Sequence, residues 1–387
     1  MIDKKIEQEP SLCTGCTACY NACPASAIEM KDNKEGFLYP VVDYSKCIKC
    51  GKCVSICPTI NHKLSNNDEA VDVYVAYNTD EKIRERSSSG GVFTLIAENI
   101  LNDDGIVYGA AFDDQWNVVH RRVDNITDLD LLRGSKYVQS NLGDVYSRCL
   151  NDLNNGKNVL FSGTPCQIAG LYSFLGKPYN NLFTVDIICH GVPSPLVWRK
   201  YISEKFGINC IKSINFRCKT NGWSNYSVKI EHRNKLNYEI KANEDIFMRG
   251  FLDNLYLRES CYNCRFKSVG RISDITLSDA WGVEKFKSEL YCSTGTSMVL
   301  IQSERGKILF DDISKYLVIG KVSASVVAQY NSAVNKSVLK HKNREVFFSK
   351  LNDCESVCKI IDKLLDQISL RKKISFAIRS RLKSLFK

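Results

Sequence analysis

Two runs of four cysteines, each followed by a proline, constrain this chain more than any other feature. Both runs have the spacing C-x2-C-x2-C-x3-C-P, and they begin at Cys13 and at Cys47. Bacterial ferredoxins with two [4Fe–4S] clusters have this spacing, and the fourth cysteine of each run binds the other cluster. The sequence therefore predicts one cluster on Cys13, Cys16, Cys19 and Cys57, and a second on Cys47, Cys50, Cys53 and Cys23.

Disulfides and zinc are the alternatives for eight cysteines. Zinc sites favour two separated pairs of cysteines rather than three cysteines at steps of three. Disulfides need an oxidising compartment, whereas the chain begins Met-Ile-Asp-Lys-Lys without an apolar signal region. The eighteen cysteines of the whole chain therefore indicate a reducing cytoplasm, and the identical spacing of the two runs favours the two-cluster interpretation.

The length of 387 residues exceeds what a ferredoxin alone requires. We expect an α+β or α/β protein with four parts. They are a dicluster ferredoxin-type domain over residues 1–62, an α/β domain over 73–195, an α+β domain over 196–350 and a basic terminal helix over 355–387. Within the first part we expect a strand at residues 37–42 and a short helix after each proline, and a polar linker follows at 61–72.

The net charge of +10 does not indicate a nucleic-acid partner, because most of it lies in the tail. Residues 371–387 contain seven basic and no acidic residues, which leaves only +3 for the rest of the chain. No uninterrupted apolar stretch is long enough to span a bilayer. A basic groove over the body of the protein is therefore not expected.

Strand-like and helix-like segments alternate in the first large domain, which predicts an α/β core with loops at the strand ends. The expected strands are residues 73–77, 106–112, 118–123, 159–161 and 183–188, and the expected helices include 92–97 and 168–175. From residue 209 the pattern changes to alternating strands with one helical segment. These are strands 214–217, 226–230 and 275–277 and the helical segment 247–257.

Two small polar loops are candidate ligand sites. One follows the first strand of the α/β domain and consists of Ser87, Ser88, Ser89, Gly90 and Gly91. Its glycines would let the backbone approach a phosphate or a flat ring where a Cβ would collide. A plain serine helix cap is the alternative. The second loop holds Lys136, which could meet a phosphate or a flavin carbonyl, or could be a solvated surface lysine.

A third set of cysteines lies outside the first domain. Cys261 and Cys264 form a C-x2-C pair, and Cys166 and Cys189 each follow an expected strand. Four thiols are enough for a third [4Fe–4S] cluster, and buried structural cysteines are the alternative. His190, next to Cys189, is a candidate proton donor or a structural histidine.

Five stretches together resemble one known family, the coenzyme F420 hydrogenase/dehydrogenase beta-subunit family. They are Ser87 to Phe93, Gly163 to Gln167, Cys189 to Pro195, Cys261 to Phe266 and Asp274 to Gly282, and the resemblance covers roughly residues 1–320. It implies an FAD-binding core with an iron–sulfur centre beside it. It also implies that the Ser87–Gly91 loop and Lys136 lie at the flavin, and that Cys166, Cys189, Cys261 and Cys264 bind the core cluster.

We therefore expect an iron–sulfur flavoprotein oxidoreductase. Electrons would pass from ferredoxin or a partner redox subunit through [4Fe–4S] clusters to FAD, and then to an unidentified small-molecule acceptor. Family analogy suggests coenzyme F420 or a polysaccharide-biosynthesis substrate as that acceptor. One alternative is an electron-relay subunit of a larger hydrogenase or dehydrogenase with no substrate of its own. A regulatory protein that senses redox state through its clusters is another.

The terminal helix has a second interpretation. Ile374, Ile378, Leu382 and Leu385 recur at steps of four, four and three, and basic residues occupy most of the remaining surface. This is typical of a helix in a membrane interface, and it predicts peripheral membrane contact of a cytoplasmic protein. The alternative is a terminal helix packed on the protein itself or on a partner subunit.

Overall fold

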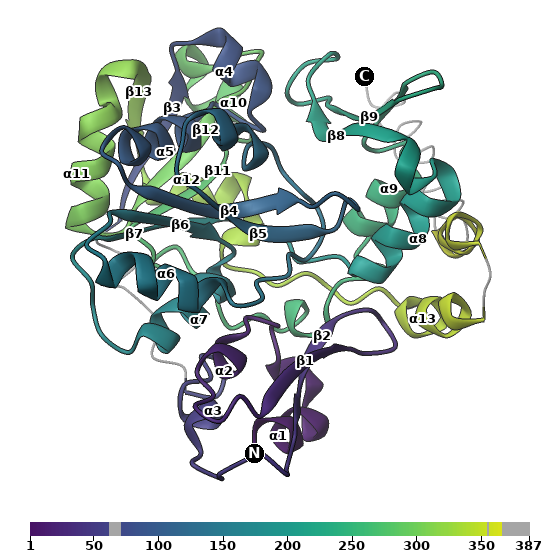
Figure 1. The fold of residues 1–387 in the computed structure, drawn as a ribbon. Coiled ribbons are helices and arrows are strands. Elements are labelled where there is room, and N and C mark those ends of the chain that lie inside the picture. Colours follow the sequence, from purple (N-terminus) through teal and green to yellow (C-terminus); the bar gives the residue numbers. More distant parts are fainter. Residues whose placement is uncertain (62–70, 354–355, 366–387) are drawn as a thin grey trace.

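The computed structural model describes residues 1–61, 71–353 and 356–365, apart from the side chain of Asn352. Figure 1 shows three parts, which are a small N-terminal domain in purple, a central sheet covered by helices, and a lobe that carries α8, α9 and α13. The fold is a mixed α/β fold with an N-terminal ferredoxin-like domain, as the sequence predicts. Most of the expected linker and the apolar residues of the terminal helix lie outside the described residues.

The N-terminal domain places a two-stranded sheet between the two cysteine runs. Its elements are α1 (Ile2–Gln8), α2 (Ala18–Asn21), β1 (Ile28–Asp32), β2 (Leu38–Val42) and α3 (Lys52–Ser55). Strands β1 and β2 pair antiparallel, and Ile28 lies opposite Val42. The predicted strand at 37–42 is confirmed, one residue shorter at its start.

The backbone repeats its conformation in the two cysteine runs. Gly15 and Lys49 have φ of 71° and 56°, and Thr17 and Gly51, two residues later, have φ of 60° and 74°. These left-handed residues start the short helices inside the runs, before the prolines. The expectation of a helix after each proline is therefore wrong, because the turn that begins each helix comes between the second and third cysteines.

An eight-stranded mixed sheet forms the centre of the molecule, in the order β13-β3-β12-β11-β7-β6-β4-β5. The strands are β3 (Asp72–Asn78), β4 (Ile106–Phe112), β5 (Val118–Val123), β6 (Val159–Gly163), β7 (Leu182–Ile187), β11 (Ile275–Asp279), β12 (Ser297–Ile301) and β13 (Leu317–Val322). Strands β4, β6, β7 and β11 run parallel to one another, whereas the strands at both ends pair antiparallel. The sheet combines strands from the predicted domains 73–195 and 196–350.

Helices cover both faces of this sheet. Side chains alternate along each strand, so Val107 and Leu160 pack with α5 (Val92–Asn102) and α11 (Glu304–Ile313) on one face. On the opposite face, side chains of β4 and β6 pack with α6 (Val145–Asn154) and α7 (Pro165–Leu175). Side chains of β3 and β12 on that face pack with residues of α10 (Val283–Phe286) and α12 (Ala324–Tyr330). Helix α4 (Glu81–Arg86) follows β3. Burial on both faces explains why the central strands β4 and β6 are mostly apolar.

The second lobe has its own small sheet and apolar core. Its elements are α8 (Pro195–Lys205), β8 (Ile211–Cys218), β9 (Ser227–His232), β10 (Tyr238–Lys241), α9 (Ile246–Leu252) and α13 (Arg344–Asn352), and residues 357–365 are helical. Helix α9 is shorter than the predicted segment 247–257, because Asn254 takes a φ of 62° and Leu257 bridges to Pro193. Among the described residues no helix is both long and apolar enough to cross a membrane.

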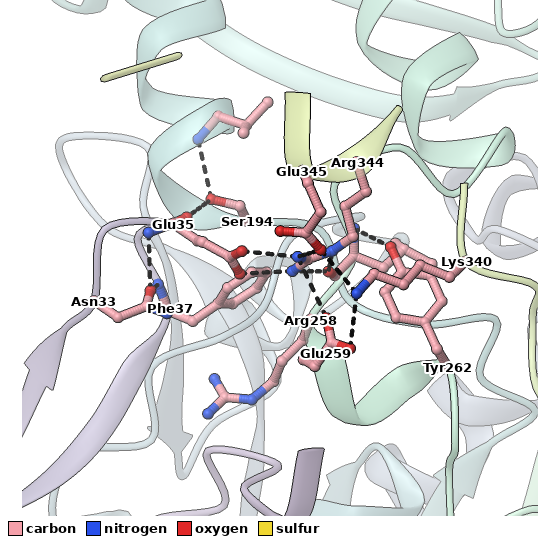
Figure 2. A network of polar contacts seen from close by, with 12 residues as sticks. Asn33, Glu35, Phe37, Ser194, Arg258, Glu259, Tyr262, Lys340, Arg344 and Glu345 are labelled. Carbon is pink, nitrogen blue, oxygen red and sulfur yellow. Dashed lines mark hydrogen bonds and ion pairs between the residues drawn. The ribbon is translucent and has the colours of Figure 1, made fainter. Parts of the chain in front are cut away.

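The tip of the β1–β2 hairpin inserts into this lobe. Phe37 is fully buried in the apolar core of the lobe, and a Cβ on Gly36 would lie 2.1 Å from Cβ of Leu196. Beside them the Arg344 guanidinium donates to both carboxylate oxygens of Glu35 at 2.7 and 2.6 Å (Figure 2). Because the Arg344 side chain is only 2% exposed, this ion pair is shielded from water and holds the hairpin to the lobe.

We predict that Arg344→Ala destabilises the protein by about 3–5 kcal/mol, because it leaves the Glu35 carboxylate and the Leu257 carbonyl without their partner. The control is Lys307→Ala, which breaks an exposed pair with Asp311 and should cost far less stability, because water screens that pair. Denaturant unfolding followed by tryptophan fluorescence measures both. Equal losses in the two variants would contradict the proposed contribution of the buried pair.

Candidate functional site

Three small cavities each collect four cysteine thiols. The first, of about 20 Å³, is lined by Cys13, Cys16, Cys19 and Cys57. The second, also of about 20 Å³, is lined by Cys23, Cys47, Cys50 and Cys53. The third, of about 30 Å³, is lined by Cys166, Cys189, Cys261 and Cys264. The structure thus brings together the three sets of four cysteines that the sequence predicts.

The placement of these thiols suits a four-iron cluster. Within the described ranges no three His, Cys, Asp or Glu side chains converge as they would around one metal ion. In each of the first two sets, three thiols come from one cysteine run and the fourth comes from the other run, whereas the third set combines three separate segments. This arrangement suits a four-iron cube, whose irons each take one thiolate from a different side.

Two parallel strands bring the thiols of the third cavity together. Cys166 lies in the first turn of α7, directly after β6, and Cys189 follows β7, the neighbour of β6. Carboxyl ends of adjacent parallel strands lie at the same sheet edge, so these two thiols meet there. Cys261 and Cys264 come from the loop between α9 and β11. Thr164 and Gln167 form a capping box that fixes the start of α7.

Burial shapes the electrostatics of the thiols. Desolvation, together with a smaller contribution from neighbouring cysteines, raises the pKa of Cys16 and of Cys261 to about 12. The pKa values of Cys166 and Cys189 are also raised, mainly by burial. Four thiolates therefore cannot coexist in such a cavity without compensating positive charge. Iron supplies such charge, so the donor sets fit iron–sulfur clusters.

Arg258 connects the first and third cavities. Its side chain is fully buried and lines the third cavity with Cys261. Its guanidinium donates to the carbonyl oxygen of Cys13 at 2.7 Å and to Sγ of Cys13 at 3.3 Å, and it also donates to the Leu38 carbonyl. One cation thus touches a thiol of the N-terminal domain and faces the core thiols.

A much larger cavity, of about 470 Å³, adjoins the third thiol cavity. Residues Cys189 to Val192 line both. Ser87, Ser88, Ser89, Gly91 and Lys136 lie on the wall of the large cavity. Ser88 Oγ accepts hydrogen bonds from the backbone N–H and the hydroxyl of Ser135, which joins the two predicted ligand loops.

The glycines of the first loop serve packing and backbone conformation. A Cβ on Gly90 would lie 2.6 Å from the carbonyl oxygen of Ala76 and 2.8 Å from the backbone nitrogen of Ser297, and Gly90 is not part of the cavity wall. Gly91 has a φ of 81°, and a Cβ there would face Asn78 and Ile83. The missing Cβ atoms would meet residues of β3, β12 and α4, so packing accounts for both glycines, and their contact with a ligand stays a prediction.

The two candidate catalytic residues are both held by neighbours. Lys136 Nζ donates to the carbonyls of Leu131 and Arg133 at 2.9 and 2.8 Å, and burial lowers the pKa of Lys136 to about 7. It is therefore not a freely solvated surface lysine. The His190 ring bonds Oδ1 of Asn254 at 2.7 Å, and burial lowers its pKa too.

Sequence analysis missed several polar residues on the wall of the large cavity. His120 Nε2 donates to the Ser162 carbonyl at 3.0 Å and Nδ1 accepts from Ser140, which in turn accepts from Gln167. Because one ring nitrogen donates and the other accepts, the ring is neutral and carries its proton on Nε2. Arg217 makes two 3.0 Å bonds with Asp279, and its guanidinium lies 4.0 Å from the Tyr226 ring. No local spacing signals these contacts, since their partners are distant in sequence.

Three family profiles match the chain. Residues 12–61 match the 4Fe-4S dicluster domain, residues 73–146 match the coenzyme F420 hydrogenase/dehydrogenase beta subunit N-terminus, and residues 156–325 match the C-terminus of the same subunit. A coenzyme F420-dependent sulfite reductase of Methanocaldococcus jannaschii is 22% identical over 313 residues, which are 77% of this chain and 45% of that protein.

Two further relatives are similar to parts or most of the chain. An uncharacterized ferredoxin of Methanocaldococcus jannaschii is 37% identical over 57 residues, 14% of this chain and 34% of the ferredoxin. A chain in the F420-reducing [NiFe] hydrogenase complex from Methanosarcina barkeri is 16% identical, with a TM-score of 0.46 and coverage of 78% of this chain and 92% of that one. The chain spans about half the length of the curated relatives that match it over the longest stretches.

The His120 network predicts a pH dependence of stability. Burial lowers the pKa of His120 from 6.5 to about 4, so the folded state prefers the neutral ring. This preference contributes about 3 kcal/mol to the free energy of unfolding above about pH 6.5. The contribution is lost as the pH falls toward 4, because the unfolded chain then binds the proton more readily than the folded one.

Replacement of the His120 ring should remove this loss of stability at acidic pH. We expect the thermal midpoint of the wild type to fall more steeply between pH 7 and 5 than that of His120→Gln. Scanning calorimetry of both proteins across this range gives the comparison, and parallel curves would contradict the neutral, buried assignment of His120.

Proposed function

Since the chain belongs to the coenzyme F420 hydrogenase/dehydrogenase beta-subunit family and carries a 4Fe-4S dicluster domain, we propose that it is an electron-relaying iron–sulfur subunit of a larger oxidoreductase. This is the relay that the sequence offers as an alternative to a self-contained reductase. The observation that carries it is the set of three four-thiol cavities, of which Arg258 joins two.

The cysteines would hold one [4Fe–4S] cluster in each cavity, and each cluster would carry one electron at a time. The residues around each cavity determine its contacts with the core and the charge beside its thiols. Cys16 packs against Gly170 of α7, where a Cβ would lie 2.9 Å from Cβ of Cys16, so the first cavity sits directly on the core. Lys267, Arg258 and Arg271 place positive charge beside the third cavity. Positive charge near the sulfurs favours the reduced state.

The large cavity supports a second part of the proposal, a flavin beside the third cluster. Its volume of about 470 Å³ lies in the range of cofactor pockets, and it is walled by aromatic rings, backbone and a few polar groups. Tyr226, Trp281 and Tyr137 offer flat surfaces to a ring system. Ser88 joins the two loops through Ser135, and Lys136 bonds the Leu131 carbonyl within its own loop.

The same cavity is the one observation that favours a self-contained reductase as a second candidate, because it leaves room for a small-molecule acceptor such as a coenzyme F420-like compound. Turnover with a soluble acceptor alone would support that candidate. Turnover that requires a partner redox subunit would support the relay. A link between this protein and polysaccharide biosynthesis stays a proposal that rests on family analogy.

Iron content tests the cluster assignment. We predict about twelve irons per chain in the anaerobically purified protein, since three cavities would each take four. Cys261→Ser should lower the content by about four irons, because a hydroxyl replaces a soft thiolate poorly. Cys210→Ser, at a cysteine outside the three cavities, is the matched control and should keep all of them. Equal iron in the two variants would remove the third cluster from the proposal.

Flavin binding tests the large cavity. We predict that Lys136→Met weakens FAD binding to flavin-depleted protein about tenfold or more, because the loop loses the ammonium that bonds its carbonyls. Lys177→Met, an exposed lysine beside Tyr179, should bind FAD like the wild type. Flavin fluorescence titration measures both affinities. Wild-type affinity in Lys136→Met would place the flavin elsewhere.

A further inference from the structure

Charge is segregated within the N-terminal domain. Residues 1–61 contain seven lysines and seven acidic residues, so the domain is neutral overall. Residues 44–61, however, contain Lys46, Lys49 and Lys52 and no acidic residue. These lysines alternate with the cysteines of the second run. Three lysines therefore lie beside the second thiol cavity, where Asp43 pairs with Lys46 and the Asp3 carboxylate accepts from the Tyr44 hydroxyl.

The same segment is exposed to solvent. Of the twelve thiols that line the three cavities, all of them in described parts of the chain, Cys50 alone is exposed. Ile48 is 66% exposed and Tyr44 48%, although both are apolar or aromatic. The three lysines are exposed as well, and Lys46 forms its one ion pair with neighbouring Asp43 at 3.3 Å. Apolar residues on such a surface commonly mark a contact site.

The two thiol cavities of the N-terminal domain differ in where they lie relative to the core. Thiol Cys13 of the first cavity faces the core through Arg258, and Cys16 packs on α7. Helix α3, which carries Lys52 and Cys53, lies in the part of the domain that points away from the central sheet (Figure 1). The first cavity therefore faces inward, and the second reaches solvent.

We propose that Tyr44, Lys46, Ile48, Lys49, Cys50 and Lys52 form the docking surface for an acidic one-electron carrier protein of the ferredoxin type. We refer to these residues as the Cys50 surface. The inference deepens the proposed function and rests on it. Electron transfer slows steeply with distance, so a carrier must approach an exposed cluster ligand, and Cys50 is the one such thiol. In the step the reduced carrier loses one electron and the second cluster gains it, and no bond or proton moves.

The chemistry of the surface fits a transient partner of opposite charge. Lysines around a small apolar centre steer an acidic protein into place and speed association, while a small contact area keeps the complex short-lived. Charge-rich contacts of this kind weaken as salt screens them. An anionic membrane is the other surface that three lysines and exposed Ile48 and Tyr44 could meet, and the experiment separates the two.

The test uses full-length holoprotein and a dithionite-reduced, acidic bacterial ferredoxin in stopped-flow mixing. Lys49 has left-handed backbone, which Asn tolerates, so Lys49→Asn removes the charge without backbone strain and Lys49→Glu reverses it. We expect the second-order rate at low ionic strength to fall in the order wild type, Lys49→Asn, Lys49→Glu, with a loss of about tenfold or more in the last. The wild-type rate should also fall most steeply with added salt.

The control is Lys31→Glu, which makes the same charge change on β1 of the same domain and should keep the wild-type rate. Iron content and the end point of dithionite reduction must match in all proteins. With both matched, equal carrier rates in all four proteins would overturn the docking surface and leave the clusters standing. Lack of dithionite-reducible iron in the wild type would overturn the proposed function and the inference together.

The membrane arm uses co-sedimentation with vesicles of equal parts phosphatidylglycerol and phosphatidylcholine. We expect Lys49→Glu to sediment like the wild type, because the surface serves a protein partner. Loss of vesicle binding in Lys49→Glu without a change in carrier rate would overturn the proposal in favour of a membrane contact.

Discussion

The contact on which the arrangement of the site depends is the one between Arg258 and the first cysteine of the chain. A fully buried guanidinium is costly unless its donors are paired, and here they bond the carbonyl and Sγ of Cys13, the Leu38 carbonyl and the Gln139 side chain. The Tyr39 ring lies 4.4 Å from its centre. Because most of these partners belong to the N-terminal domain and Arg258 to the core, neither part satisfies this cation alone.

This dependence links folding to the proposed function. Arg258 is followed by Cys261, whose backbone nitrogen bonds the Arg258 carbonyl, so the residue that docks the N-terminal domain also positions a thiol of the third cavity. The Glu35–Arg344 pair and buried Phe37 fix the hairpin tip of the same domain, and the Phe37 ring lies 5.4 Å from the Arg258 guanidinium (Figure 2). A relay needs its carriers at fixed separations, and these two neighbouring buried contacts hold the small domain against the rest of the chain.

Sequence analysis succeeded for most features whose spacing is local, although the short helices expected after the prolines lie before them. The pair of strands at 106–112 and 118–123 and the two cysteine runs are short-range patterns, and the structure contains the strands within a residue or two of their predicted bounds. It failed where the deciding neighbour was distant. The glycines at 90 and 91 pack against Ala76, Asn78 and Ser297, a contact that the sequence did not predict. The helix expected through residue 257 ends at Leu252, because Leu257 pairs with Pro193.

The sequence by itself determined which thiols group together in the N-terminal domain, because the number and spacing of its cysteines are typical of iron–sulfur ligation and predict the two sets that line the two cavities. Tertiary structure decided everything that spans long separations. It brought Cys166 and Cys189 to the pair at 261 and 264, set the large cavity beside them, and turned Cys13 inward and Cys50 outward. The reason is physical: a thiolate loop is specified by a few adjacent dihedral angles, whereas a buried cation or a shared sheet edge is specified by contacts that exist only once the whole chain has packed.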